Sequence, residues 1–269
     1  MAVSLLAIIN ALLPKDRESA KIAADVAYGP GARHRLDIYA PAGSGPWPVV
    51  FFIYGGSWSD GSRHNYTFAG RAIAAQGFVT VIADYRLVPE VEYPAFLQDC
   101  ADAFAWTAHN IAGYGGDGDR MALMGHSAGA YNAVMLALDP AYLKARGVLE
   151  RVKAVVGLSG PYDFLPFDGP ISLRVFGAVR MPRTTQPINL VSAEVPPMWL
   201  ANGTEDTLVG PLNAKALARR LRQAGVEVGE TYYPKIGHAH LVMALARPLR
   251  AMAPVLAQST AFLAARLGQ

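Results

Sequence analysis

The sequence predicts an α/β domain built on a mostly parallel central sheet that is flanked by helices. Three observations support this fold class. Short segments that are apolar at every position alternate with longer segments of helical composition, a glycine-rich turn separates one such pair at residues 125–129, and 269 residues suffice for one large domain. Continuously apolar runs are typical of strands buried on both faces of a parallel sheet. We expect a single domain over residues 1–269.

The composition excludes several classes of protein. A hydrophobic content of 52% with 17% charged residues is incompatible with a disordered chain. The net charge of +3 is small and the basic residues are scattered, so nucleic-acid binding is not expected. The single cysteine, Cys100, excludes an internal disulfide, and its apolar neighbours predict an inert side chain on the buried face of a helix.

The chain begins with an apolar stretch at residues 2–13. It has no basic amino-terminal region and no small-residue cleavage site before Pro14, so it predicts a short amphipathic helix rather than a signal peptide. A cytoplasmic protein is therefore expected. No other apolar run reaches the roughly 18 residues that a membrane-spanning helix requires, so an integral membrane protein is not expected.

The elements that follow are predicted from their periodicity. Residues 23–28 and 35–39 alternate apolar and polar side chains around a Gly-Pro-Gly turn, which predicts an antiparallel hairpin at a sheet edge. Further strands are expected at residues 49–54, 78–83, 120–124, 152–158, 198–201 and 226–233. Helices are expected at residues 68–76, 95–110, 128–138, 213–224, 240–247 and 254–267. This alternation implies right-handed crossovers, with ligands bound at the carboxyl ends of the strands.

One long segment, residues 160–196, interrupts the alternation. It holds six prolines and little periodicity, and a connection of this length is usually functional. We expect residues 161–195 to form a small cap or lid over the carboxyl ends of the strands. Its apolar residues Phe164, Leu165, Phe167 and Phe176 are then available to line a substrate pocket, although part of this set is equally able to pack the cap onto the body.

The turn at residues 125–129 reads Gly125-His126-Ser127-Ala128-Gly129 and fits the G-x-S-x-G pattern of a nucleophile elbow. A strand is predicted before it and a helix after it, as this turn requires. Glycines two residues either side of the serine let strand and helix approach closely. Ser127 is therefore the predicted nucleophile, and His126 is expected to pack beside the elbow. In isolation, the same pattern also fits a serine that only caps a helix.

A serine nucleophile needs a histidine that accepts its proton and a carboxylate that orients the imidazole. Asp206 follows the strand expected at 198–201, and His238 follows the one expected at 226–233. Both would therefore lie at the carboxyl edge of the sheet, in the chain order serine, acid, histidine.

The predicted acid and the predicted histidine each have a rival residue nearby in the sequence. Glu205 is less favoured than Asp206, because a shorter side chain after a Gly-Thr turn suits a fixed hydrogen bond. His240 is less favoured than His238, because it already belongs to the start of the next helix, whereas Gly237 permits a tight loop at His238.

The remaining chemical requirement is an oxyanion hole. The amide of Ala128, at the start of a helix, supplies one donor. The loop after the strand at 49–54 contains paired glycines, which let the amides of Gly56 and Ser57 point inward. Trp58 is expected to form a pocket wall or to pack, rather than to take part in the chemistry. No zinc-type cluster of histidines and cysteines is visible, so no metal and no other cofactor is expected.

Several motifs occur together in a fixed order. They are Tyr54-Gly-Gly-Ser-Trp58, Asp84-Tyr-Arg-Leu-Val-Pro89, Tyr114-Gly-Gly-Asp117, Gly125-His-Ser-Ala-Gly129, Gly203-Thr-Glu-Asp206 and Gly237-His238. In these motifs the chain resembles the α/β-hydrolase superfamily, specifically the bacterial carboxylesterases related to hormone-sensitive lipase and the feruloyl-esterase-like group. It departs from their pattern at Tyr54, where a histidine is usual, and at Ser57, where a third glycine is usual. The segment 84–86 is expected to pair charges where a strand leaves the sheet.

The resemblance implies a cofactor-independent carboxylesterase that cleaves small short-chain or aryl esters through an acyl-enzyme. An amidase of the arylformamidase type would use the same machinery and is the alternative enzyme. A non-catalytic ligand-binding module of the same fold is the alternative from another class, although it would need a damaged triad. Monomer and homodimer both fit the sequence.

Overall fold

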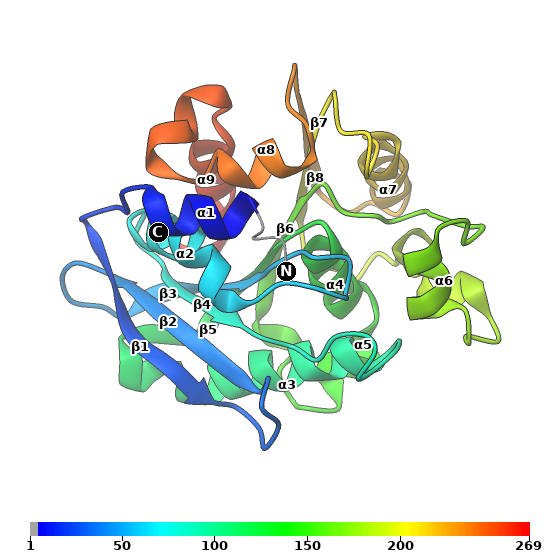
Figure 1. Ribbon diagram of the computed structural model, residues 1–269. Coiled ribbons are helices and arrows are strands. Elements are labelled where there is room, and N and C mark those ends of the chain that lie inside the picture. The colour runs from blue at the N-terminus through cyan, green and yellow to red at the C-terminus, as the bar shows by residue number, and fades with distance from the viewer. Residues whose placement is uncertain (1–4) are drawn as a thin grey trace.

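The computed structural model describes residues 5–269 and contains one eight-stranded sheet in the order β1-β2-β4-β3-β5-β6-β7-β8. The strands are β1 (Ser19–Ala27), β2 (Arg35–Pro41), β3 (Trp47–Ile53), β4 (Val79–Ala83), β5 (Gly116–His126), β6 (Val152–Leu158), β7 (Met198–Gly203) and β8 (Val228–Tyr233). β1 pairs antiparallel with β2 and β2 pairs antiparallel with β4, whereas every pair from β4-β3 to β7-β8 is parallel. The predicted parallel sheet with an antiparallel hairpin at one edge is confirmed (Figure 1).

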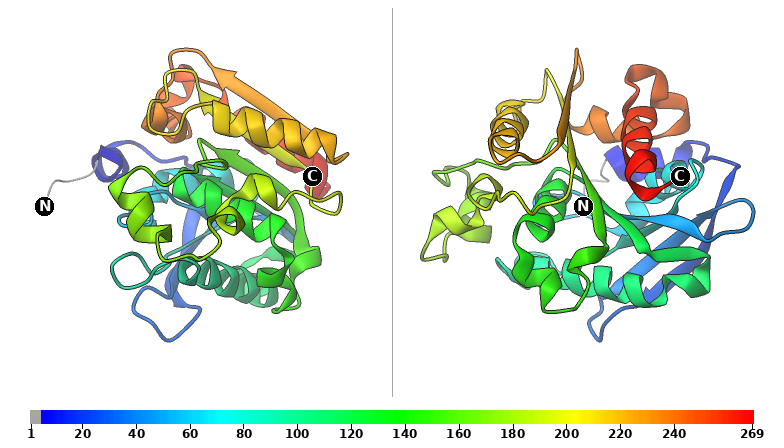
Figure 2. Two further views of the ribbon diagram at one scale, coloured as in Figure 1. Left: turned by 90° about the vertical axis from the view of Figure 1, so that its right-hand side faces the viewer. Right: turned by 180° about the vertical axis from the view of Figure 1, so that it is seen from behind.

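Helices cover both faces of this sheet. They are α1 (Leu5–Leu12), α2 (Thr67–Ala74), α3 (Ala95–Asn110), α4 (Ala128–Leu138), α5 (Pro140–Lys144), α6 (Pro170–Phe176), α7 (Leu212–Gln223), α8 (His238–Met243) and α9 (Val255–Leu267). α2 and α9 pack on one face, and α3, α4 and α7 pack on the other (Figure 2). The arrangement is the three-layered α/β-hydrolase fold. α4, which packs against the central strands β3, β5 and β6, has every residue buried.

The central parallel strands supply the core. Every side chain of β4 and β7 is buried, as are all but the first of β3. Burial on both faces explains why their sequences are apolar at nearly every position. The parallel register places Ile53 beside Gly125. The loops that leave β3 and β5 therefore begin side by side at the carboxyl edge of the sheet.

Several local details differ from the sequence-based expectation, including the start of β1 at Ser19 rather than at residue 23. β5 starts at Gly116 rather than at residue 120, because Gly116 and Asp117 pair with the start of β3 across an irregularity. α8 spans His238–Met243 rather than residues 240–247. α5 was not expected; the carboxylate of Asp139 caps it by accepting the Ala141 N–H at 3.0 Å. The helix predicted at residues 2–13 is present from Leu5 to Leu12, and residues 2–4 lie outside the described part of the chain.

The predicted cap segment contains α6 and short 3-10 turns, and it is fastened to the body of the protein. The Tyr93 N–H donates to the Val175 carbonyl at 3.1 Å. The Tyr131 hydroxyl, on α4, donates to the Thr185 carbonyl at 2.7 Å. In Figure 1, α6 stands at the side of the molecule, beyond α4. A lid function for residues 161–195 stays a prediction.

Between residues 5 and 269 the structure has no helix of the length and apolarity needed to cross a membrane. The cytoplasmic location stays a prediction from the sequence. No group of three or more histidine, cysteine, aspartate or glutamate side chains in the same residues is arranged to hold a metal ion. Cys100 is buried, and burial raises the pKa of its thiol well above the usual value.

Candidate active site

Ser127 occupies a strained turn between β5 and α4. Its φ of 56° lies in the left-handed region, which residues other than glycine rarely adopt. A Cβ atom on Gly125 would lie 2.2 Å from the Gly129 carbonyl oxygen, and one on Gly129 would lie 2.0 Å from the Ile53 carbonyl oxygen. Only glycine fits at either position, so these two residues allow the strand and the helix to meet at Ser127.

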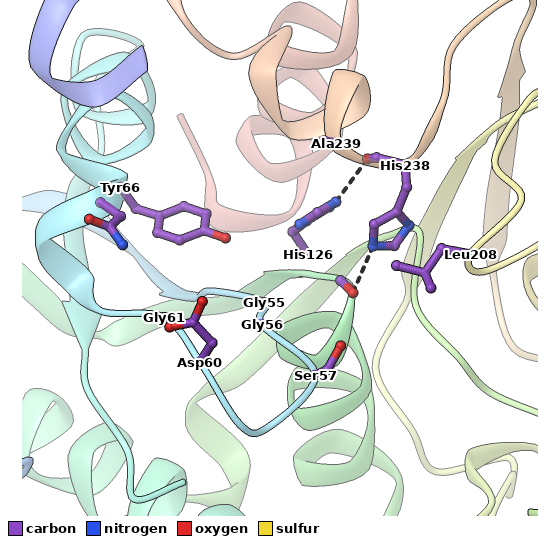
Figure 3. Close-up of a pocket in the computed structure, with 12 residues that line it drawn as sticks. Gly55, Gly56, Ser57, Asp60, Gly61, Tyr66, His126, Leu208, His238 and Ala239 are labelled. Carbon is purple, nitrogen blue, oxygen red and sulfur yellow. Dashed lines mark hydrogen bonds between the residues drawn. The ribbon is translucent and has the colours of Figure 1, made fainter. Parts of the chain in front are cut away.

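A chain of hydrogen bonds joins the three predicted catalytic side chains. His238 Nε2 lies 2.8 Å from Ser127 Oγ (Figure 3), and His238 Nδ1 lies 2.8 Å from Asp206 Oδ2. A carboxylate can only accept, so Nδ1 carries the imidazole proton and Nε2 presents its lone pair to the serine hydroxyl. In this arrangement the imidazole is able to take the proton of Ser127.

Asp206 is buried and held from several sides. One carboxylate oxygen accepts the N–H groups of Leu208 and Val209 at 3.1 and 2.9 Å, and the other accepts the Asn202 amide at 3.3 Å. Burial opposes ionisation, but the hydrogen bonds from His238 and from the Val209 N–H outweigh it, so the pKa of Asp206 lies below its usual value. The carboxylate is therefore charged at neutral pH. Asn202 was not anticipated, although it is the last residue but one of β7, the strand that leads to Asp206.

The two alternative residues lie elsewhere. Glu205 is exposed to solvent. His240 lies within α8, two residues beyond the imidazole that reaches Ser127. Among the hydrogen bonds of residues 5–269, none joins Glu205 or His240 to Ser127, Asp206 or His238.

The predicted oxyanion loop follows β3 and curls tightly. Gly56 has a φ of 136°, and a Cβ atom there would lie 2.1 Å from the Asp60 carbonyl oxygen. Ser57 and Trp58 both adopt positive φ, at 52° and 56°. In the described chain, the amides of Gly56 and Ser57 have no protein acceptor, and the Ala128 amide opens α4 without one. Unpaired amides beside Ser127 are suited to hold a developing oxyanion.

Trp58 anchors this loop to the helix behind it. Its indole N–H donates to the Asn132 side-chain oxygen on α4 at 3.0 Å. Its ring packs edge-on against Tyr131 and Phe176, with centroid distances of 5.2 and 5.0 Å. Although the backbone of Trp58 is strained, its side chain is thus fixed from both sides.

Ser127 lies between two hollows. The histidine-side hollow has a volume of about 180 Å³ and is lined by Gly55, Gly56, Ser57, Asp60, Gly61, Asn65, Tyr66, His126, Ser127, Leu208, His238 and Ala239 (Figure 3). The cap-side hollow has a volume of about 260 Å³ and is lined by Ser57, Trp58, Ser127, Ala128, Pro161, Phe164, Asp168, Gly169, Ile171, Ser172, Leu208 and Val209. A substrate bound at Ser127 therefore has separate space on two sides.

The predicted pocket residues divide into two groups. Trp58 and Phe164 line the cap-side hollow, whereas Leu165 lines neither hollow. Phe176 is fully buried and packs behind Trp58 and Phe164. Sequence reasoning missed Leu208, which lines both hollows while 68% exposed. Its position two residues after the predicted acid was the available signal.

Comparison with known proteins gives a family match and several relatives. The BD-FAE family model matches residues 36–221. A probable isoprenylcysteine alpha-carbonyl methylesterase from Oryza sativa subsp. japonica is 30% identical over 258 residues, which cover 86% of this chain and 60% of that protein. Esterase LipC from Mycobacterium tuberculosis is 31% identical over 236 residues, which cover 79% of this chain and 58% of that protein. The chain thus spans about 60% of the length of these relatives.

Solved structures share the fold. Esterase B from Lactobacillus rhamnosis, inhibited by a tributyrin phosphonate, superposes with a TM-score of 0.83 at 21% identity, covering 98% of this chain and 91% of that one. A thermostable esterase from Pseudomonas putida superposes with a TM-score of 0.82 at 22% identity, covering 98% of this chain and 88% of that one. At such identities the likeness concerns the fold alone.

Proposed function

The chain belongs to the BD-FAE family and has the α/β-hydrolase fold, and from this premise we propose that it is a serine carboxylesterase. The observation that carries the proposal is the hydrogen-bonded chain from Ser127 through His238 to Asp206, with both bonds at 2.8 Å. The names of the relatives, which include esterases and methylesterases, agree with ester hydrolysis. The proposed substrates are small short-chain or aryl carboxylic esters.

In the proposed first step, Ser127 Oγ attacks the ester carbonyl carbon as His238 Nε2 takes the serine proton. The carbonyl oxygen becomes an oxyanion that the amides of Ser57 and Ala128 hold, with Gly56 as a further donor. The charged Asp206 stabilises the imidazolium. The tetrahedral intermediate collapses, the bond to the alcohol oxygen breaks, and His238 delivers its proton to that oxygen. The products of this step are the free alcohol and an acylated Ser127.

In the second step, water replaces the alcohol. His238 removes a proton from water as the water oxygen attacks the acyl carbon, and the bond to Ser127 Oγ then breaks while the serine regains its proton. The acid leaves and the enzyme is restored. Loss of one oxyanion donor typically costs about 3–4 kcal/mol of transition-state stabilisation, and loss of the nucleophile costs more.

The same scheme assigns each half of the ester to one hollow. Because His238 must reach the leaving oxygen, the alcohol lies on the imidazole side, in the histidine-side hollow. Because the amides of Ser57 and Ala128 hold the oxyanion, the acyl group extends into the cap-side hollow, along Trp58, Phe164 and Ile171. The apolar side chains in that wall suit a hydrocarbon acyl chain.

Replacing Ile171 with tryptophan tests this assignment. The variant narrows the cap-side hollow, so kcat/KM for p-nitrophenyl hexanoate should fall roughly tenfold or more relative to that for p-nitrophenyl acetate. Leu173→Trp is the matched control, because Leu173 lies on the same helix, is exposed and lines neither hollow. Equal effects of Ile171→Trp on both esters would place the acyl group elsewhere.

A direct assay of the proposed activity compares aryl acetates with N-formyl aromatic amines of the same ring. We expect the ester to be the faster substrate. Faster cleavage of the formamide would instead assign the site to the arylformamidase class. Fluorophosphonate labelling that requires both Ser127 and His238 would exclude a purely ligand-binding role.

A further inference from the structure

His126 links the serine turn to the histidine loop. It is the last residue of β5, directly before Ser127, and its side chain is buried. Its Nε2 lies 3.1 Å from the main-chain oxygen of His238, as Figure 3 shows, and the two imidazole rings have centroids 4.9 Å apart. One side chain thus bridges two loops whose residues are 112 positions apart in the chain.

The partner of Nε2 fixes the form of this imidazole. A carbonyl oxygen can only accept, so Nε2 carries the proton and Nδ1 is a bare acceptor. Nδ1 is buried and has no hydrogen-bond partner among the described residues. Burial, and next the charge of the neighbouring His238, lower the pKa of His126 to about 3; the bond to the His238 carbonyl and the nearby Asp206 act in the opposite direction. His126 is therefore neutral at the pH of an esterase assay.

Neutrality matters at this position because His238 becomes a cation in each half of the proposed reaction. A second cation beside it would oppose proton transfer from Ser127. A neutral N–H donor, by contrast, holds the backbone of His238 without adding charge. His238 opens the short helix α8 directly after Gly237, so the contact acts on the very residue that presents Nε2 to the serine.

We propose that His126 is a positioning residue, whose Nε2–H fixes the main chain of His238 and thereby holds the catalytic imidazole within reach of Ser127 Oγ. This inference rests on the proposed esterase function. Release of the contact lets the imidazole drift from the serine. Misplacement of a reacting group by about 1 Å is able to cost roughly a hundredfold in rate.

The unpaired Nδ1 supplies a sharp test. Glutamine places its side-chain N–H near the position of His126 Nε2. It does not replace the acceptor Nδ1, but Nδ1 has no hydrogen-bond partner that would be lost. Leucine fills a similar volume with no donor, and asparagine carries a donor on a side chain too short to reach the His238 carbonyl. His126→Gln, His126→Leu and His126→Asn therefore separate the hydrogen bond from packing and from polarity.

Two rates are measured for each variant: kcat/KM for p-nitrophenyl acetate and the second-order rate of inactivation by a fluorophosphonate. Both should fall about tenfold to a hundredfold in His126→Leu and His126→Asn. His126→Gln should regain most of that loss. Melting temperatures show whether each variant is folded, and if the leucine variant is not, the glutamine and asparagine pair carries the comparison.

Equal losses in all three variants would mean that the imidazole ring acts only through packing, and unchanged rates in all three would mean that the contact has no effect on catalysis. Either result overturns the proposal. Ser127→Ala in the same assay separates this inference from the proposed function. If Ser127→Ala still turns over, the esterase mechanism is wrong; if it is inactive while His126→Leu is normal, only the positioning role is wrong.

Discussion

The hydroxyl of Tyr54 donates a hydrogen bond of 2.8 Å to the carboxylate of Asp84. The same hydroxyl accepts a bond of 2.8 Å from Arg33, which also donates to the Gly61 carbonyl at 2.9 Å. Burial, and next the Asp84 charge, raise the pKa of Tyr54 well above its usual value, so the hydroxyl keeps its proton. Tyr54, which stands where the resembling carboxylesterases have a histidine, thus anchors both ends of the predicted oxyanion loop.

Tyr54→Phe should therefore lower both stability and activity. The variant leaves Arg33 and Asp84 each without one buried partner, which costs about 1–3 kcal/mol of unfolding free energy. Urea unfolding measures this loss. Tyr114→Phe is the control, because the Tyr114 hydroxyl makes no hydrogen bond to residues 5–269 and its removal should change little. Equal stability of the two variants would contradict an anchoring role for the Tyr54 hydroxyl.

The free energy of unfolding should depend more strongly on the Asp84 carboxylate than on the Tyr54 hydroxyl. It accepts the Arg63 N–H at 2.7 Å and also pairs with the buried Arg63 guanidinium. Asp84→Asn leaves that cation with less compensation and should cost about 3–5 kcal/mol. The exposed pair of Asp102 and Arg146 is the control, since Asp102→Asn should cost no more than about 1 kcal/mol. Urea unfolding measures the free energy of unfolding of both variants. Similar losses in Asp84→Asn and Asp102→Asn would contradict a buried ion pair between Asp84 and Arg63.

Gly129 tests the geometry of the serine turn. A Cβ atom there meets the Ile53 carbonyl oxygen at 2.0 Å, and a backbone oxygen in the sheet has no room to move. Gly129→Ala should therefore abolish ester hydrolysis or prevent folding. Gly113→Ala should be harmless, because a Cβ atom at that glycine has no neighbour within 4 Å. Normal hydrolysis of p-nitrophenyl acetate by Gly129→Ala would show that the turn is looser than described.

Most of the fold could be predicted because the central parallel strands are apolar at nearly every position. The exceptions have local causes. Residues 116–119 are rich in glycine and aspartate and resemble a turn, yet they extend β5 because the start of β3 lies beside them. α5 has only five residues, too few for a periodic signal, and its local signs are the cap at Asp139 and Pro140 in its first turn.

The site residues could be predicted from the sequence because strand ends converge at one edge of a parallel sheet. The contacts between side chains could not be predicted, because the contacting residues are far apart in sequence. The segment 84–86 was expected to pair charges, and both of its charged residues do. Their partners could not be named in advance: Asp84 pairs with Arg63, and Arg86 pairs with Asp99. Packing of His126 beside the turn was expected, whereas its hydrogen bond to His238 required the fold.

The pKa of His126 leads to a prediction about stability. In the folded protein this pKa is about 3, against 6.5 without burial, so the unfolded chain binds more protons between these values. Its contribution to stability is therefore complete above about pH 6.5 and is lost as the pH falls towards 3. His238 and Asp206, the titratable groups beside His126, are also present in His126→Gln, the variant used for comparison.

Urea unfolding of both proteins at pH 7, 6 and 5 isolates the effect of His126. Relative to His126→Gln, the unmodified protein should lose up to about 1.4 kcal/mol for each pH unit below about 6.5. Parallel stability curves would mean that His126 takes up a proton in the folded state, and that the imidazole is not neutral beside His238.

Hydrolysis of p-nitrophenyl acetate by Ser127→Ala tests the central claim most directly. Ser192→Ala is the control, since Ser192 is exposed and lines neither hollow at Ser127. We predict that Ser127→Ala loses at least about a thousandfold in kcat while its melting temperature stays close to that of the control. A folded Ser127→Ala that hydrolyses the ester at the rate of the control would contradict an acyl-enzyme on Ser127.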